Sequence, residues 1–172
     1  MFNDNTHIID DDDIPYENAE KWCIGVDYGT GNATTWLLLM KDKNGIIYVV
    51  DEYYFAGRKE AQESGNFELQ KTDLEYTEDM REFILDHYDL TNLTYREIDI
   101  MVDPAASSFI LQMRRFHMRS KKANNEVLDG IRNVATMFAD SRLFVSNKCK
   151  NLIEEIHSYS WDDKAQARGR TF

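Results

Sequence analysis

Two aspartates at the ends of separate apolar segments are the residues best suited to do chemistry. Asp27 ends the segment 22–27, and Asp103 directly follows the segment 98–102. If both segments are neighbouring central strands of a mixed sheet, their ends form the kind of edge where ligands bind. Two carboxylates that meet there repel each other unless a cation lies between them. The pair therefore predicts a metal centre in which Asp27 and Asp103 are both metal ligands and catalytic residues.

Carboxylate oxygens are hard ligands that suit Mg²⁺ or Mn²⁺. Two such ions can activate a water molecule and stabilise the leaving oxygen of a phosphodiester. Each aspartate also has a purely structural interpretation, because Asp103 precedes Pro104 as a helix N-cap would, and Asp27 opens a glycine-rich turn. The substitution Asp103→Asn separates the two interpretations, since asparagine caps a helix well but binds metal poorly.

Basic side chains gather in one stretch of this acidic sequence. They are Arg114, Arg115, His117, Arg119, Lys121 and Lys122, with no acidic residue among them. The stretch is either a solvated helix end, whose cations favour the helix dipole, or a contact for a DNA phosphate backbone. Arg58, Lys59 and Lys71, in a polar segment, are weaker candidates for DNA binding.

The elements that must position these residues follow from the pattern of apolar residues. Strands are expected at 22–27, 34–40, 46–55, 98–102 and 143–145, with a hairpin turn at Asn44-Gly45. Residues 57–72 are polar and are expected to form a loop. Helical periodicity follows a capping-box pattern at 72–75, and returns after Pro104, at 127–138 and at 149–156. The order predicts an α/β fold with an RNase H-like mixed sheet, three antiparallel strands then parallel strands, flanked by helices.

Length and charge limit the domain organisation. The 172 residues allow one domain with a sizeable core. The net charge is −11, and residues 1–20 hold seven acidic residues and no Lys or Arg. We expect residues 1–20 to be an acidic linker or flexible arm and residues 21–172 to form the domain. The absence of a signal peptide and of a long apolar run, together with two isolated cysteines, Cys23 and Cys149, predicts a cytoplasmic protein.

The segment 25–34, GVDYGTGNAT, resembles the first acidic motif of the large subunit of tailed-phage terminases. The similarity continues in YFAGRK (54–59), QKTD (70–73), VDPAASSF (102–109), KANNEVLDGI (122–131) and the segment 149–162. It covers nearly the whole chain after residue 21 and corresponds to the C-terminal RNase H-like nuclease domain of that family.

The resemblance implies a Mg²⁺- or Mn²⁺-dependent endonuclease that cuts concatemeric double-stranded DNA with two metal ions. It places Asp27 and Asp103 as the first and second metal-binding acids. It implies the terminase ATPase domain, the small terminase subunit and the portal as partners in an infected or lysogenic host cell. The family has a third acid in a helix beyond the segment that corresponds to 161–165, so the resemblance predicts a C-terminally incomplete domain here.

Two other functions remain open at this point. The motif 25–32 also resembles the first phosphate loop of actin, sugar kinases and Hsp70, where the acid positions Mg²⁺. Those proteins close a second such domain over the nucleotide, and 172 residues do not supply one. A truncated remnant that keeps the fold but does not cut DNA is the other alternative.

Overall fold

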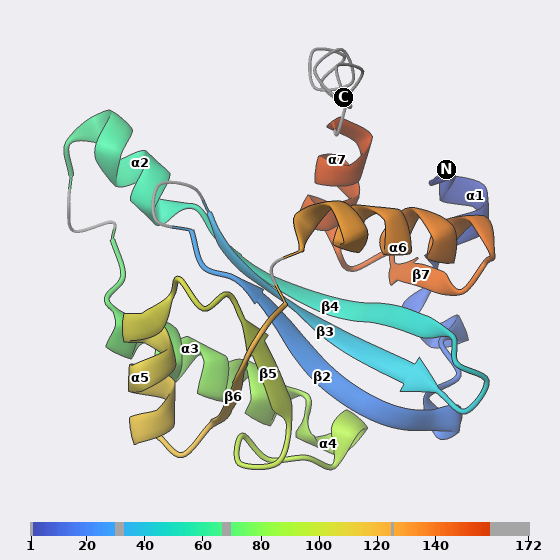
Figure 1. Ribbon diagram of the computed structural model, residues 1–172, viewed down its shortest axis with the longest axis horizontal. Helices are drawn as coiled ribbons and strands as arrows, with labels where there is room; N and C mark the ends of the chain where they lie inside the picture. The colour runs from blue at the N-terminus through green and yellow to red at the C-terminus, as the bar shows by residue number, and fades with distance from the viewer. Residues whose placement is uncertain (1, 30–32, 67–69, 125, 159–172) are drawn as a thin grey trace.

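The computed structural model describes residues 2–29, 33–66, 70–124 and 126–158, and its centre is a mixed sheet (Figure 1). Within these residues the strand order is β1-β7-β4-β3-β2-β5-β6. The strands are β1 (Ile8–Ile9), β2 (Ala19–Asp27), β3 (Thr34–Asp42), β4 (Ile47–Phe55), β5 (Asp99–Val102), β6 (Arg119–Lys122) and β7 (Leu143–Ser146). The predicted RNase H-like sheet is confirmed, because β2, β3 and β4 form an antiparallel meander while β5 pairs parallel to β2 and β7 pairs parallel to β4.

The hairpin between β3 and β4 forms at the predicted Asn-Gly turn. Gly45 has a φ of 80°, a conformation that favours glycine. The carboxylate of Asp42 accepts hydrogen bonds from the backbone N–H groups of Asn44 (2.9 Å) and Ile46 (2.8 Å). These bonds provide hydrogen-bond partners for the carboxylate of Asp42, which is almost fully buried, and they fix the register of the meander.

Helices cover both faces of the sheet. They are α1 (Asp4–His7), α2 (Gly57–Ser64), α3 (Asp73–Asp86), α4 (Tyr88–Thr91), α5 (Ser107–Arg115), α6 (Val127–Ala139) and α7 (Lys150–Ser158). Helices α3, α4 and α5 lie on one side of the sheet, and α6 and α7 lie on the other (Figure 1). None of the helices in the described part of the chain has the length and apolar character needed to span a membrane.

Two apolar clusters correspond to the two faces. The larger cluster packs α3 and α5 against the central strands, with Trp36, Tyr76 and Phe109 as its largest fully buried side chains. The smaller one packs α6 and α7 against β4 and β7 around Phe138, Val145 and Cys149. Cys149 and the half-buried Cys23 are both free thiols.

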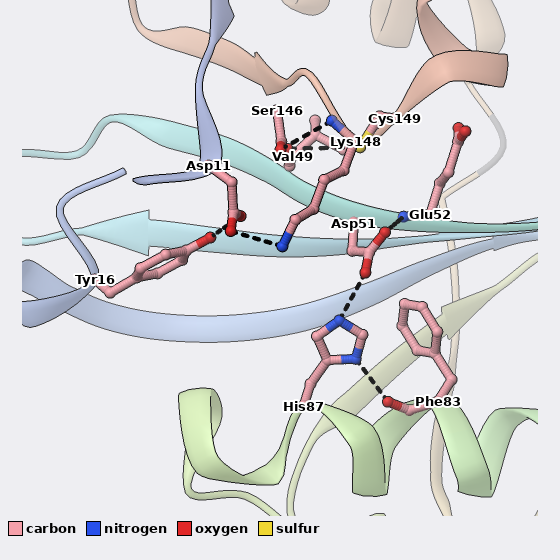
Figure 2. Close-up of polar contacts among 10 residues, drawn as sticks. All are labelled: Asp11, Tyr16, Val49, Asp51, Glu52, Phe83, His87, Ser146, Lys148 and Cys149. Carbon is pink, nitrogen blue, oxygen red and sulfur yellow. Dashed lines mark hydrogen bonds and ion pairs between the residues drawn. The ribbon is translucent and has the colours of Figure 1, made fainter. Parts of the chain in front are cut away.

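The acidic segment 1–20 is not the flexible arm that its composition predicts. Residues 2–20 pack on the domain, so folded structure begins well before Trp22. Strand β1 pairs in parallel with β7, and Ile14 is only 4% exposed within the larger cluster. The Asp11 carboxylate accepts a hydrogen bond from the Tyr16 hydroxyl (2.6 Å) and pairs with the Lys148 ammonium (2.6 Å; Figure 2). The acidic run is therefore held by the burial of Ile14 in the larger cluster and by the ion pair of Asp11 with Lys148, which precedes α7.

One further prediction of local structure is wrong, and one strand was not predicted. The polar segment 57–72, expected to be a loop, begins with helix α2, which ends at Gly65 in the left-handed conformation. The second half of the basic stretch forms edge strand β6, whereas its structural interpretation was a solvated helix end. By contrast, the predicted capping box at the start of α3 is present, since the Thr72 side chain accepts from the Glu75 backbone N–H and the Glu75 carboxylate accepts from that of Thr72.

Candidate metal centre

The pairing of β2 with β5 brings the two predicted metal ligands to the same edge of the sheet. The strands are parallel, and Val26 is opposite Val102. Asp27 and Asp103 each follow one of these valines directly, so they occupy adjacent positions on strands about 4.8 Å apart. Asp27 is exposed and Asp103 is half-buried. The two residues that sequence reasoning singled out, 76 positions apart in the chain, are neighbours at the carboxyl ends of central strands.

Asp103 also shapes the turn before α5. Its Oδ1 accepts a hydrogen bond from the backbone N–H of Ala105 (2.7 Å), and its carbonyl oxygen accepts one from Ala106 (3.0 Å). The N-cap of α5 is Ala106, without a side-chain capping bond, so the interpretation of Asp103 as the N-cap is wrong. The turn bond uses one carboxylate oxygen, and an asparagine at this position would retain it.

Tyr28 anchors the backbone that follows Asp27. Its hydroxyl donates a hydrogen bond to Asp73 at the start of α3, and its ring stacks on Phe109 of α5 with centroids 4.8 Å apart. The edge of Tyr76 also contacts the ring, at 5.6 Å between centroids. These contacts tie the end of β2 to both helices on that face, which restricts the position of Asp27. Residues 30–32 of the glycine-rich motif lie outside the described residues.

A further acid, Glu155 of α7, lies close enough to Asp27 for the charge of Asp27 to act on it, and the sequence pattern did not single it out. Burial raises the pKa of the Glu155 carboxyl, and the charges of Glu52 and Asp27 raise it further. Glu52 fixes α7 there, because its carboxylate accepts from the backbone N–H groups of Asn151 (2.7 Å) and Leu152 (2.9 Å) and from the Asn151 side chain (2.9 Å). No group of three His, Cys, Asp or Glu side chains suited to hold a metal occurs within the described residues.

Two of the predicted DNA-binding residues share one carboxylate of the neighbouring strand. Arg119 Nε (2.9 Å) and Lys121 Nζ (2.8 Å) both pair with the carboxylate of Asp99, the first residue of β5. The hydrogen bond from Lys121 and the charge of Arg119 lower the pKa of Asp99. Lys122, by contrast, is opposite Val102 and therefore lies beside the carboxyl end of β5. Of the cations on β6, Lys122 is the one nearest the level of Asp103.

The other basic candidates are spread over the molecule. Arg114 and Arg115 end α5, about 10 Å along the helix axis from its first residue. Lys71 pairs with Asp79, and its ammonium lies 4.6 Å from the centre of the Phe55 ring. Arg58 and Lys59 belong to α2, but their side chains lie outside the described residues. The structure therefore does not gather the predicted basic residues into one patch.

Comparisons with known proteins give similar chains among the phage terminases. The large terminase of a thermophilic bacteriophage, solved in complex with ADP, superimposes with a TM-score of 0.81 at 39% identity, over 99% of this chain and 38% of that chain. The terminase large subunit of Escherichia phage T5 is 25% identical over 148 residues, which are 85% of this chain and 29% of the T5 protein. The large terminase nuclease domain of P22 has the same fold, with a TM-score of 0.70 at 13% identity over 95% of this chain and 79% of that domain. No protein-family model matches the chain. The chain thus spans less than two fifths of the thermophilic-phage and T5 proteins.

Proposed function

We propose that this chain, a homologue of phage terminase large subunits with the RNase H-like fold of their nuclease domains, is a metal-dependent endonuclease domain of a DNA-packaging terminase. The observation that carries the proposal is the adjacent placement of Asp27 and Asp103 at the carboxyl ends of β2 and β5. The homology with the thermophilic-phage and T5 proteins supports the same assignment. In this proposal the substrate is concatemeric double-stranded DNA.

The donor set fits Mg²⁺ or Mn²⁺, since Asp27 and Asp103 offer carboxylate oxygens and no sulfur or imidazole ligand stands beside them in the sequence. Two such ions, when bound, would supply an activated water and neutralise charge on the leaving oxygen. Asp27 and Asp103 would hold them, and Tyr28 would keep Asp27 in place through Asp73 and Phe109. Lys122 is the cation best placed to orient a DNA phosphate beside the pair.

The proposed partners follow from the same homology. They are double-stranded DNA, a terminase ATPase domain, the small terminase subunit and the portal. Among the residues that the structure describes, which leave out 30–32 of the shared motif, no observation favours a nucleotide-binding role of the actin, sugar-kinase and Hsp70 type. A remnant that does not cut DNA is distinguished from a working nuclease by the assay below.

The test is nicking of supercoiled plasmid DNA in Mn²⁺ and in Mg²⁺, with chelator as the blank. Loss of a residue that only hydrogen-bonds a metal ligand typically lowers activity roughly 10- to 100-fold. Asp27→Asn and Asp103→Asn remove proposed ligands themselves, so each should lower the nicking rate by more than this. Asp103→Asn keeps the turn bond to Ala105, so its folding should match the unsubstituted chain by circular dichroism.

Asp129→Asn is the matched control, because Asp129 is an exposed acid on α6 whose ion pair with Arg132 is 3.6 Å long. This variant should nick at the unsubstituted rate. Metal-dependent nicking that survives both Asp27→Asn and Asp103→Asn would contradict the proposed site. A chain that folds and does not nick in either metal would favour the remnant.

A further inference from the structure

Strands β2, β5 and β6 share the face of the sheet that carries the proposed metal pair. Side chains alternate between the two faces along a strand, and partner residues of parallel strands project to the same side. Asp103 lies two residues beyond Met101 and four beyond Asp99, so these three side chains emerge on one face. Asp27 is on that face too, as the neighbour of Asp103 on β2. The opposite face is the one that packs against α3 and α5.

Two cations of β6 project from the same face as the metal pair. Arg119 is opposite Asp99, and Lys121 is opposite Met101. Both cations reach the Asp99 carboxylate, at 2.9 Å from Arg119 Nε and 2.8 Å from Lys121 Nζ. The side chains of Arg119 and Lys121 are 54% and 47% exposed, whereas that of Asp99 is 14% exposed. The face therefore presents the two cations to solvent and holds the acid beneath them.

Lys21 of β2, which the sequence pattern did not single out, adds a third cation. It lies two residues before Cys23, which is opposite Asp99, so its side chain emerges on the same face. The hydrogen bond from Lys121 lowers the pKa of Asp99, and the charge of Lys21 lowers it further, so Lys21 lies close to this carboxylate. Lys21 is exposed. Three exposed cations thus surround one mostly buried acid, in a chain whose net charge is −11.

The three cations lie at increasing distances from the metal pair along the strands. Two residues of a strand span about 6.7 Å, so Lys121 is about 7 Å and Arg119 about 13 Å from the level of Asp103. Lys21 is six residues before Asp27, which is about 20 Å along β2. One strand of B-DNA advances about 3.4 Å per nucleotide. The three distances therefore correspond to about two, four and six nucleotides from a phosphate at the metal centre.

We propose that Lys121, Arg119 and Lys21 form a basic track for the phosphate backbone of the DNA strand held at the metal centre. The inference rests on the proposed nuclease function and specifies how its DNA substrate is held. Asp99 competes with the backbone for Arg119 and Lys121, because its carboxylate pairs with both in the free protein. Since it offsets one of their two charges, Asp99 lowers the affinity of the basic track for DNA.

The test is binding of a labelled duplex of about 20 base pairs, measured by fluorescence anisotropy in chelator at about 50 and 200 mM salt. The affinity of a protein for B-DNA varies with the salt concentration to the power of about −0.9 for each phosphate contact. Arg119→Gln, Lys121→Gln and Lys21→Gln should each remove one contact. Each should therefore weaken binding about 15-fold at 50 mM salt and about 4-fold at 200 mM salt.

Asp99→Asn should change the affinity in the opposite direction. The substitution frees one positive charge of the basic track, so binding should tighten by about the same factors and depend more steeply on salt. If the ion pairs of Asp99 only joined β5 to β6, its loss would not raise the affinity for DNA. The three cation variants test the basic track separately, because their side chains are exposed and their loss should leave the fold intact.

Asp89→Asn and Arg81→Gln are the matched controls. Asp89 of α4 and Arg81 of α3 are exposed, and both helices lie on the opposite side of the sheet (Figure 1). Each control makes the same change in net charge as the variant it matches, and each should bind the duplex as the unsubstituted chain does. The proposal is overturned if the cation variants bind as tightly as the unsubstituted chain, if a folded Asp99→Asn variant does not bind more tightly, or if the controls shift the affinity as much.

The result is separable from the nuclease assignment, since binding in chelator needs neither metal nor cleavage. A chain that fails to nick plasmid DNA but shows these changes in affinity loses the nuclease assignment and keeps the basic track. A chain that nicks plasmid DNA, and whose Arg119→Gln and Lys21→Gln variants bind normally, loses the basic track alone.

Discussion

The substitution Ile14→Ala tests whether the acidic N-terminal segment is part of the fold in solution. Ile14 lies in the 3₁₀ region between Asp11–Asp13 and Tyr16–Asn18, and its side chain is 4% exposed within the larger apolar cluster. Next to it, the Tyr16 ring stacks on Trp22 of β2 with centroids 6.3 Å apart. If the segment were a detached arm, Ile14 and Tyr16 would be exposed to water. The free energy of unfolding of the Ile14→Ala variant therefore tests whether the segment packs on the domain.

The expected cost follows from the burial of Ile14. Truncating a fully buried isoleucine to alanine lowers the free energy of unfolding by about 2–5 kcal/mol. A chain of this size loses roughly 2–4 °C of Tm per kcal/mol, so the Tm should fall by about 4–20 °C. Urea unfolding followed by tryptophan fluorescence gives the free energy, and an unchanged m-value would show that the variant still unfolds from the same folded state.

Asp13→Ala is the control for this measurement. Asp13 lies in the same segment with an exposed side chain, and its substitution should change stability by no more than about 0.5 kcal/mol. An Ile14→Ala variant that is equally neutral would show that residues 2–20 do not pack on the domain, which would refute the structural account of this segment.

Two other predictions concern carboxylates that link the layers. Glu52→Gln should lower the free energy of unfolding by about 1–3 kcal/mol. The glutamine amide has one oxygen, so it cannot accept hydrogen bonds from the backbone N–H groups of both Asn151 and Leu152 as the two carboxylate oxygens do. Faster hydrogen exchange at the Asn151 and Leu152 amides would localise this effect, and unchanged exchange at both would contradict it. His87 faces the Phe83 carbonyl (2.7 Å) and the Asp51 carboxylate (2.9 Å), which both accept, so the folded state favours the imidazolium with both ring nitrogens donating (Figure 2). Burial alone would lower the pKa of His87, but these two bonds raise it above 6.5. Protonated His87 therefore stabilises the folded state fully below pH 6.5, and this contribution is lost as pH rises through the folded-state pKa. For Asp51, burial opposes ionisation, but the bonds from His87 and the Glu52 backbone lower its pKa below 3.8, so its contribution is lost only as pH falls through that lowered value. Urea midpoints measured from pH 5 to 9 should therefore decline less steeply for His87→Gln than for the unsubstituted chain, and equal slopes would contradict the assignment.

The central sheet and the position of the two aspartates could be predicted because local patterns determine them. The apolar runs that precede Asp27 and Asp103 mark strands, and the Asn44-Gly45 turn fixes the hairpin between two of them. A strand end is visible in the sequence as the point where the apolar run stops. The pairing of β2 with β5 then required only the usual parallel crossover through a helix.

The elements that were missed lack such a local pattern. Strand β1 has two residues, and its pairing with β7 joins Ile8 to Val145, which no nearby residue indicates. The acidic composition of residues 1–20 outweighs the few apolar residues that make the contacts, of which Ile14 is the most buried. Helix α2 is polar over most of its length, so periodicity could not reveal it. Strand β6 lies at an edge and is almost entirely charged, as edge strands that resist further pairing often are.

The electrostatic part of the site depends on pairing that the sequence does not display. Counting cations between Arg114 and Lys122 suggests one DNA-binding patch, but Arg119 and Lys121 share an ion pair with Asp99 of the neighbouring strand, which offsets one of their two charges. An ion pair of this kind reduces the attraction of both cations for a phosphate. Conversely, the charges of Asp27 and Glu52 act on Glu155 because Glu52 anchors α7 through hydrogen bonds to residues about 100 positions away in the chain. The field at the proposed metal centre is therefore set by which helices and strands the fold brings together, and not by the charge of any one segment.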